Sequence, residues 1–382
     1  MKIFAKKMTI GDGFSKIVFL CGSHFFESDI TDKRTVLKTF INKQYGDKVK
    51  VIILEENFLL IKSSKKQLGY DSIFLNSLGM IEKMVALYSD KVIVIHESIS
   101  TATELGIFSI DPSVASKTCM IVPDENSQEE NKVSYFMRKA FIDLPNNTHA
   151  IKEIRFYPDT RRNNKSPNRT EYYTYFHNNE IGSKLRERII SFLNFDTDAS
   201  PTVATIYQSN YKQPSASGNI ISYKIIPIED TGKGNLDECI EVSINVKALQ
   251  VLLMSIIALY SNDEGLKKEK QIYQHVDNII EKLNRHMIES VKYYSGQVIN
   301  TNKIVWKLSE TDCTIRQATG LYLYILQAMS YISMEVPTDS QNYEIRRIVI
   351  KEGFKALKES LRDNFIPLET TEFGSVFNES KQ

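Results

Sequence analysis

Residues 90–109 constrain the fold more than any other stretch of the chain, because a strand, a loop and a helix start follow one another there. Residues 91–95 form a short apolar run rich in β-branched side chains, which is typical of a strand covered on both faces. Serine and threonine residues then supply turn and cap groups, and Glu104 opens an apolar helix. In an open α/β sheet, ligands bind outside the carboxyl ends of the strands. A glutamate at that place can therefore take part in chemistry.

Glu104 has a second interpretation. The spacing Thr101-x-x-Glu104 fits a capping box, in which the glutamate only satisfies backbone groups at the helix start. The stretch by itself favours neither interpretation, and both stay open.

The first third of the chain alternates strands and helices. Apolar runs predict strands at residues 16–22, 49–55, 91–95 and 118–122, and helical spacing predicts helices at 32–45, 77–88 and from 103 onward. This order argues for a parallel sheet with right-handed crossovers. We therefore predict an α/β fold, in which a Rossmann-like (flavodoxin-like) parallel sheet domain precedes a mainly helical carboxy-terminal domain.

Three regions follow from the pattern. We expect an α/β domain over residues 1–150, an irregular connecting region over 151–219, and a mainly helical regulatory or partner-binding domain over 220–382. In the last region Asn245 caps an apolar helix, residues 266–294 carry an apolar stripe, and helices are also expected at 314–334 and 343–365. We interpret the stripe as core, and a partner seam is the alternative.

Composition excludes some classes of protein. With 48 basic and 47 acidic residues, the net charge of +1 points to no partner, so any basic patch must be local. The four cysteines are scattered without a C-x-x-C pair, which argues against a disulfide framework and a metal site and fits a reducing cytoplasm. No apolar stretch is long enough for a bilayer span or a signal peptide. We expect a cytoplasmic protein without a metal or cofactor.

Polar residues follow the predicted strands at their carboxyl ends. All these ends lie on one edge of a parallel sheet, and Glu104 starts the helix after the third strand. Glu82 joins them only if its helix brings it to the same edge. The residues that we assign to substrate binding on this basis are Cys21, Gly22, Ser23, Glu55, Glu97, Ser98 and Thr103.

Residues 16–142 resemble the nucleoside 2-deoxyribosyltransferase-like family, and most closely the retron toxin effectors that carry this domain. The order and spacing of many short matches carry the resemblance. They are Ile17-Val-Phe-Leu-Cys-Gly22, Arg34 with Leu37 and Phe40, Leu54-Glu55 with Phe58, Glu82, Asp90-Lys-Val-Ile-Val, Glu97-Ser98, Thr103-Glu-Leu-Gly-Ile-Phe-Ser109, Cys119-Met-Ile-Val-Pro-Asp124 and Ser134-Tyr-Phe136.

The resemblance implies a mechanism. Glu104 takes the position of a nucleophile that attacks the anomeric carbon of an N-glycoside, and Glu82 that of an acidic residue near the sugar or the leaving base. For Glu82 the alternative is a solvated helix glutamate. Ser98 stands where classical transferases carry an aspartate that protonates the base, so a leaving group that needs no proton, such as the nicotinamide of NAD, is favoured. Cys21 is a second candidate nucleophile, and a buried strand-end cysteine is the interpretation that we prefer.

A basic run with aromatic neighbours occupies residues 155–169. Cations for phosphate and rings for stacking suit single-stranded nucleic acid, whereas a solvated loop is the competing interpretation. We name Arg161, Arg162 and Lys165 as the candidate contacts.

The sequence therefore predicts a hydrolase that acts on NAD or a related nucleotide, the toxin effector of a retron anti-phage system. The resemblance implies a reverse transcriptase and a multicopy DNA–RNA hybrid as partners, and we expect a homo-oligomer or larger assembly. The first alternative is a nucleoside deoxyribosyltransferase or nucleotide N-hydrolase of salvage. The second is a non-catalytic module that senses a nucleotide.

Overall fold

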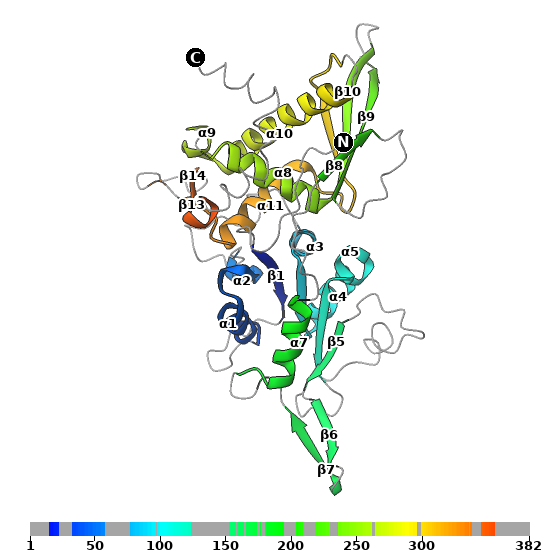
Figure 1. Ribbon diagram of the computed structural model, residues 1–382, viewed down its shortest axis with the longest axis vertical. Coiled ribbons are helices and arrows are strands. Elements are labelled where there is room, and N and C mark those ends of the chain that lie inside the picture. Colours follow the sequence, from blue (N-terminus) through cyan, green and yellow to red (C-terminus); the bar gives the residue numbers. More distant parts are fainter. Residues whose placement is uncertain are drawn as a thin grey trace. The chain divides into compact units, whose positions relative to one another are not determined.

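A five-stranded parallel sheet forms the centre of the amino-terminal part of the chain (Figure 1). Its strands run in the order β2-β1-β3-β4-β5, which is the flavodoxin-like order. They are β1 (Lys16–Cys21), β2 (Val49–Ile52), β3 (Lys91–Ile95), β4 (Thr118–Pro123) and β5 (Glu153–Tyr157). All four pairings are parallel. The α/β fold with a flavodoxin-like parallel sheet is thus confirmed.

The computed structural model describes residues 15–22, 33–57, 77–96, 98–123, 153–157, 159–163, 166–173, 176, 180–194, 204–208, 219–229, 236–261, 264–295, 299–335, 337 and 345–355. The chain divides into two compact units. One consists of Ser15–Asn57 and Ser77–Thr197, and the other of Met1–Phe14, Phe58–Asn76 and Asp198–Gln382. No helix among the described residues is long and apolar enough to cross a membrane.

Helices of the first unit cover the sheet. They are α1 (Lys33–Tyr45), the short η2 (Gly46–Lys48), α2 (Leu54–Asn57), α3 (Leu78–Tyr88), α4 (Ile99–Ile110), α5 (Pro112–Ala115) and α7 (Ser183–Asn194). Apolar side chains of α1 and α7, such as Leu37 and Leu185, form one core cluster with strand residues such as Val18 and Ile93. Phe19 of β1 meets Phe108 of α4 edge to face, with ring centroids 6.2 Å apart.

The region between residues 151 and 219 is more regular than expected. Besides β5 and α7 it contains β6 (Asp159–Asn163), β7 (Ser166–Tyr173) and β8 (Ala204–Gln208). β6 and β7 pair as an antiparallel hairpin with an irregular register after Arg162. The basic aromatic loop expected at 155–169 is therefore wrong as a loop, because most of these residues belong to strands.

The second unit combines helices with two sheets (Figure 1). The larger sheet has the order β12-β10-β9-β8, and the smaller has the order β11-β14-β13. The elements not yet named are β9 (Asn219–Glu229), β10 (Leu236–Ile244), α8 (Val246–Leu259), α9 (Glu264–Lys267), β11 (Lys270–Gln271), α10 (Ile272–Ser295), β12 (Ile304–Leu308), α11 (Ile315–Ala328), β13 (Ile332–Glu335) and β14 (Ile345–Ile350).

Three of the four helices expected in this region are present, and their caps explain where two of them begin. The Asn245 side chain accepts a hydrogen bond from the Ala248 amide at 2.7 Å and caps α8. Thr314 begins α11 through a capping box with Gln317. The stripe of α10 is buried, as a core interpretation requires, at Ile272, Val276, Ile279, Leu283 and Met287.

The helix expected over residues 343–365 is wrong at its beginning. Residues 345–350 instead form strand β14, which pairs with β13 and β11. The β-branched side chains of this stretch and the burial of Arg346 and Ile348, two residues apart, match the period of a strand.

Asp90, just before β3, is hydrogen-bonded to the start of β1. Its carboxylate accepts a hydrogen bond from the Ile17 amide at 2.8 Å, and its own amide donates to the Ile17 carbonyl at 2.8 Å. The acidic residue that opens the Asp90-Lys-Val-Ile-Val match therefore has a structural role.

Replacing Asp90 tests this role. Asp90→Ala should lower the free energy of unfolding by about 1–3 kcal/mol, because the Ile17 amide loses a charged acceptor. Asp47→Ala is the control: that side chain is 98% exposed and forms a surface ion pair with Lys50, so the cost should stay below about 1 kcal/mol. Denaturant unfolding of both variants measures the difference. Equal costs would contradict the structural role.

Candidate active site

Three glutamates and a cysteine converge at the carboxyl edge of the parallel sheet. Cys21 ends β1, Glu55 lies on α2 just after β2, Glu82 lies in the second turn of α3, and Glu104 lies on α4 after β3. Each glutamate acts electrostatically on the Cys21 thiol, and Glu55 and Glu82 act on Glu104. The strand order reverses between β1 and β3, so this is the edge at which open α/β sheets bind ligands.

Glu104 does not cap its helix. Helix α4 starts at Ile99, one turn earlier than the sequence indicated, and Ser98 is its N-cap. Ser98 forms a capping box with Thr101: the Thr101 amide donates to Ser98 Oγ at 3.4 Å, and the Ser98 amide donates to Thr101 Oγ1 at 3.1 Å. Glu104 lies in the second turn, so the capping-box interpretation of this glutamate is wrong.

The Glu104 carboxyl group lies in surroundings that disfavour its charge. Burial raises its pKa, the charges of Glu82 and Glu55 raise it further, and Arg34 and a hydrogen bond from Cys21 oppose these effects; the resulting pKa is about 8. Its Oε2 atom is inaccessible to water and has no hydrogen-bond partner among the residues that the structure describes. A buried, unpaired carboxylate oxygen costs free energy, and such atoms call for a functional explanation.

Glu82 is a buried side chain. Only 8% of the residue is exposed, so the alternative of a solvated helix glutamate is wrong. Burial raises its pKa, and the charge of Glu55 adds to this effect, bringing the pKa to about 7. Glu82 and Glu104 therefore form a coupled pair that gives up its protons in two steps around neutral pH.

The Cys21 thiol is buried beside the carboxylates. Burial first and the charge of Glu104 second raise its pKa well above the usual range of a thiol. The thiol is then protonated at neutral pH, and it donates a hydrogen bond to Glu104. The structure thus favours a buried strand-end cysteine over a thiolate nucleophile.

Arg34 supplies a positive charge beside these glutamates. The sequence alone assigned this residue no role in the site. Its Nη1 donates to both carboxylate oxygens of Glu55, at 3.0 and 2.9 Å, and its side chain is 3% exposed. Its aliphatic stem packs on Gly22, where an added Cβ would come within 2.9 Å of Arg34 Cδ. Two sequence signals were available: Arg34 is part of the family resemblance, and it is a charged residue among the apolar residues of the first helix.

The remaining predicted site residues lie in different places. Ser98 has its hydroxyl at the helix cap, and Thr103 is exposed with its hydroxyl donating to the Ile99 carbonyl at 3.2 Å. Arg161 is on β6, and its side chain lies outside the description. Arg162 is on the same strand, and its side chain lies outside the described part of the structure too, as do Ser23, Glu97 and Lys165 altogether. Substrate binding by these residues stays a prediction.

His96 supports the loop that leads into α4. Its Nδ1 lies 3.1 Å from Thr101 Oγ1, and burial lowers its pKa, which favours the neutral ring. Within the described part of the chain, no three side chains of histidine, cysteine, aspartate or glutamate are arranged to hold a metal ion.

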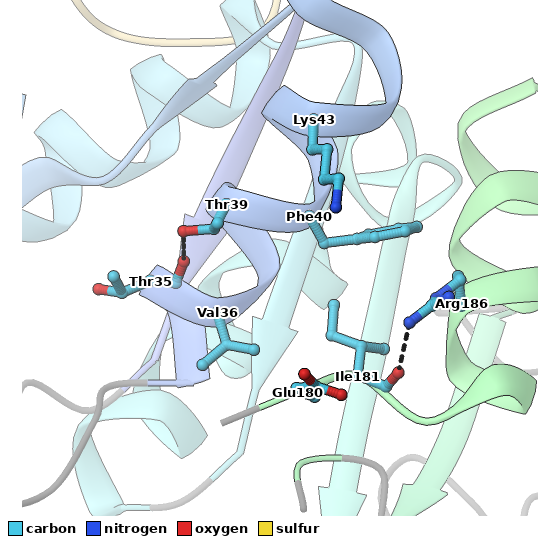
Figure 2. A pocket seen from close by; sticks show the side chains of 8 residues that line it. All are labelled: Thr35, Val36, Thr39, Phe40, Lys43, Glu180, Ile181 and Arg186. Carbon is cyan, nitrogen blue, oxygen red and sulfur yellow. Dashed lines mark hydrogen bonds between the residues drawn. The ribbon is translucent and has the colours of Figure 1, made fainter. Parts of the chain in front are cut away.

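A cavity of about 340 Å³ lies between α1 and the start of α7 (Figure 2). Arg186 donates to the Ile181 carbonyl at 3.2 Å, and its guanidinium lies 5.8 Å from the centroid of the Phe40 ring. The lining residues are Thr35, Val36, Thr39, Phe40, Lys43, Glu180, Ile181 and Arg186. Glu55, Glu82 and Glu104 are not among them, so this cavity is separate from the site that those three glutamates form.

The fold and the site define an α/β protein with a buried carboxylate pair at the switch point of its sheet. A comparison with protein families adds the particular family: the model of the STM3845 retron effector protein matches residues 31–334. The match covers most of the 382 residues, and the chain belongs to this family. A comparison with curated proteins found no match.

The expected retron effector identity is thus confirmed. The matched range includes Arg34, Glu55, Glu82 and Glu104 and most of the described carboxy-terminal unit. Membership supports a role in retron anti-phage defence and implies association with other retron components. The resemblance to nucleoside 2-deoxyribosyltransferases stays a prediction.

The raised pKa values predict how stability depends on pH. An unfolded glutamate ionises near 4.5, whereas Glu104 ionises near 8 and Glu82 near 7 in the folded protein. Between these limits the unfolded chain binds fewer protons, so the stability that is complete below pH 4.5 falls as the pH rises to about 8. Glu104→Gln should remove much of this loss and melt at a higher temperature than the wild type at pH 8.

Thermal unfolding between pH 5 and pH 8 measures the effect. Glu187→Gln on the exposed face of α7 is the control, and it should melt with the pH dependence of the wild type. A Glu104→Gln variant that loses as much stability as the wild type over this range would show that Glu104 is ionised at neutral pH.

Proposed function

We propose that the amino-terminal unit hydrolyses the N-glycosidic bond of NAD or a related nucleotide, with Glu104 as nucleophile. We further propose that this activity makes the effector toxic. One observation carries the proposal: within the described part of the chain, Oε2 of Glu104 has no hydrogen-bond partner, and the carboxyl group lies beside buried Glu82 at the edge where open α/β sheets bind ligands. Paired carboxyl groups of this kind carry out glycoside hydrolysis in many enzymes.

The proposed reaction has two steps. Ionised Glu104 attacks C1′ of the ribose attached to nicotinamide, and the C1′–N bond breaks with its electron pair going to the ring nitrogen. Nicotinamide leaves as a neutral molecule, and the sugar becomes esterified to Glu104. In the second step ionised Glu82 takes a proton from a water molecule, which attacks C1′ and releases ADP-ribose with Glu104 as a carboxylate.

Two features favour a pyridinium leaving group. Ser98 stands where an aspartate would protonate a departing base, and its hydroxyl is engaged with the Thr101 amide. A hydroxyl is a poor acid, whereas nicotinamide needs no proton to leave. When Glu82 and Glu104 are ionised, the three glutamates of the site outnumber Arg34 in charge, which suits a cationic ring.

Salvage chemistry is the second candidate, and one observation favours it. Glu82, with a pKa of about 7, holds a proton part of the time at neutral pH, and such a group is able to protonate a leaving nucleobase. A nucleoside deoxyribosyltransferase or nucleotide N-hydrolase would use it in that way. A module that only senses a nucleotide would bind it without turnover.

The purified protein should distinguish these functions. We expect nicotinamide release from NAD to be faster than adenine release from deoxyadenosine, because only the first leaving group departs without a proton. Glu104→Gln should reduce the release at least about a thousandfold while the protein stays folded, and Glu187→Gln should leave it unchanged. If the free protein is silent, the assay is repeated with the complete retron during induced toxicity.

Faster release of adenine would favour salvage chemistry. Binding of NAD without release of nicotinamide, in the free protein and in the complete retron, would favour the sensing module. Full turnover in a folded Glu104→Gln variant would show that Glu104 is not the nucleophile.

We also propose that the β6–β7 hairpin contacts the multicopy DNA–RNA hybrid of the retron, where a reverse transcriptase is the second partner. The supports are Arg161 and Arg162 of β6 and Lys165, which follows in the sequence, in a chain whose net charge is only +1, together with the tyrosines of β7. Cations neutralise phosphates, and rings stack on unpaired bases at about 1–3 kcal/mol per base.

Changing Arg161, Arg162 and Lys165 together to glutamine should weaken association with the hybrid and flatten its salt dependence, because fewer counterions are released. Glycosidic activity of the free protein should hardly change, since the carboxylates come from other elements. Binding of labelled hybrid at several salt concentrations is the measurement. An unaltered affinity and salt slope would show that the hairpin does not contact the hybrid, and the carboxy-terminal unit would become the candidate contact.

A further inference from the structure

Arg34 is a charged side chain buried at the centre of the carboxylate site. The residue is 2% exposed, and two neighbours fix its position. The absence of a side chain at Gly22 leaves room for its stem, and the Glu55 carboxylate accepts both hydrogen bonds from Nη1. These contacts connect the ends of β1 and β2 through helix α1.

The groups around Glu104 come from four elements. They are the Cys21 thiol of β1, Arg34 of α1, Glu55 of α2 and Glu82 of α3. Arg34 is the cation among these groups: its stem packs on Gly22, the residue after Cys21, and the Cys21 thiol donates a hydrogen bond to Glu104. From this position its charge favours the ionised form of both Glu104 and Cys21. Among the described residues, three ionised carboxylates and one guanidinium would leave two negative charges in excess. The charge of Arg34 therefore limits how readily the pair Glu82 and Glu104 loses its protons.

We propose that Arg34 is a positioning residue that makes Glu104 ionisable, and that Glu55 moderates it by forming an ion pair with it. Arg34 does not need to touch the substrate for this role, because it acts through the charge of Glu104. The consequence for catalysis rests on the proposed function. The electrostatic effect on Glu104 and Glu82 is independent of any substrate.

Replacing Arg34 and replacing Glu55 should shift the ionisation of Glu82 and Glu104 in opposite directions. Removing the positive charge in Arg34→Gln makes the carboxyl groups harder to ionise. Removing the negative charge in Glu55→Gln makes them easier to ionise, because one repulsive neighbour disappears and Arg34 is released from its ion pair. A residue pair that only holds α1 against α2 would lower stability in both variants and would shift no titration in opposite directions.

The structure offers a matched control. Lys38 and Glu56 form a second ion pair between the same two helices, with side chains that are 28% and 38% exposed. Lys38→Gln removes an ion pair between α1 and α2 without touching the carboxylate site. Gly22→Ala is the complementary variant, because it changes no charge and yet takes the space that the stem of Arg34 occupies.

The first readout is the melting temperature between pH 5 and pH 9, which needs no activity. Arg34→Gln should extend the loss of stability to higher pH, by about one unit or more, since a neighbouring opposite charge shifts a carboxyl pKa by 1–3 units. Glu55→Gln should move it to lower pH, and Lys38→Gln should leave it in place. If the melting temperatures of the wild type and these three variants depended on pH in the same way, the proposal would be overturned.

The second readout is the pH profile of kcat/KM for nicotinamide release from NAD. In Arg34→Gln the acidic limb of this profile should move to higher pH, so that activity lost at pH 7 is regained near pH 9. In Glu55→Gln the acidic limb should move to lower pH. Arg34→Lys keeps the charge and should retain most of the wild-type profile, and Gly22→Ala should behave like a weaker Arg34→Gln. If Arg34→Gln does not fold, the opposite shifts of Gly22→Ala and Glu55→Gln decide.

The two readouts separate the two claims. Opposite shifts of the stability curves without nicotinamide release would support the role of Arg34 and reject the proposed function. Nicotinamide release with an acidic limb that stays in place in every variant would support the function and reject the role of Arg34.

Discussion

Burial of carboxyl groups beside one another is the constraint around which the site of the first unit is built. Glu104 and Glu82 approach each other where water is largely excluded, Glu55 adds a third acidic group, and Arg34 supplies the counter-charge. The folded protein holds protons on Glu82 and Glu104 at a pH where an unfolded chain has released them. Such an arrangement costs stability, and a fold that keeps it needs a compensating reason.

The sheet provides the rigidity that this repulsion requires. β1 and β3 are buried along their whole length, and Asp90 ties their starts together. The carboxyl ends of the strands and the helices that follow are thereby fixed against a packed core. The carboxyl groups cannot relax apart without disturbing that core, so proton binding relieves part of the repulsion.

Much of the sheet could be predicted because its strands are short apolar runs between helical periods. Cys21 and Glu104 could be brought to one edge because parallel strands end on the same side, whereas the place of Glu82 depended on the direction of its helix. The start of α4 could not be predicted correctly, since Thr101 followed by Glu104 and Ser98 followed by Thr101 offer similar spacings. Three-dimensional contacts decide between them. The role of Arg34 was hidden because its meaning depends on Gly22 and Glu55, which are distant in sequence.

The strands of the second unit were missed for a different reason. Residues 345–350 lie next to residues that fit a helical period, and only pairing with β11 and β13 makes them a strand. Tertiary contacts override local preference in such segments. The family match covers residues 31–334, which include parts of both units. The two units therefore occur together in retron effectors of this family.

The central claim is that Glu104 forms a covalent bond to the sugar. The most direct measurement is mass spectrometry of the protein after incubation with an NAD analogue that carries fluorine at the 2′ carbon of the nicotinamide ribose. Fluorine destabilises the cationic transition state of the second step and allows the ester to accumulate. The account predicts the mass of the fluorinated ADP-ribosyl group on the peptide that contains Glu104. An adduct on Glu82 or Cys21, or turnover of NAD with no adduct on any carboxylate, would contradict it.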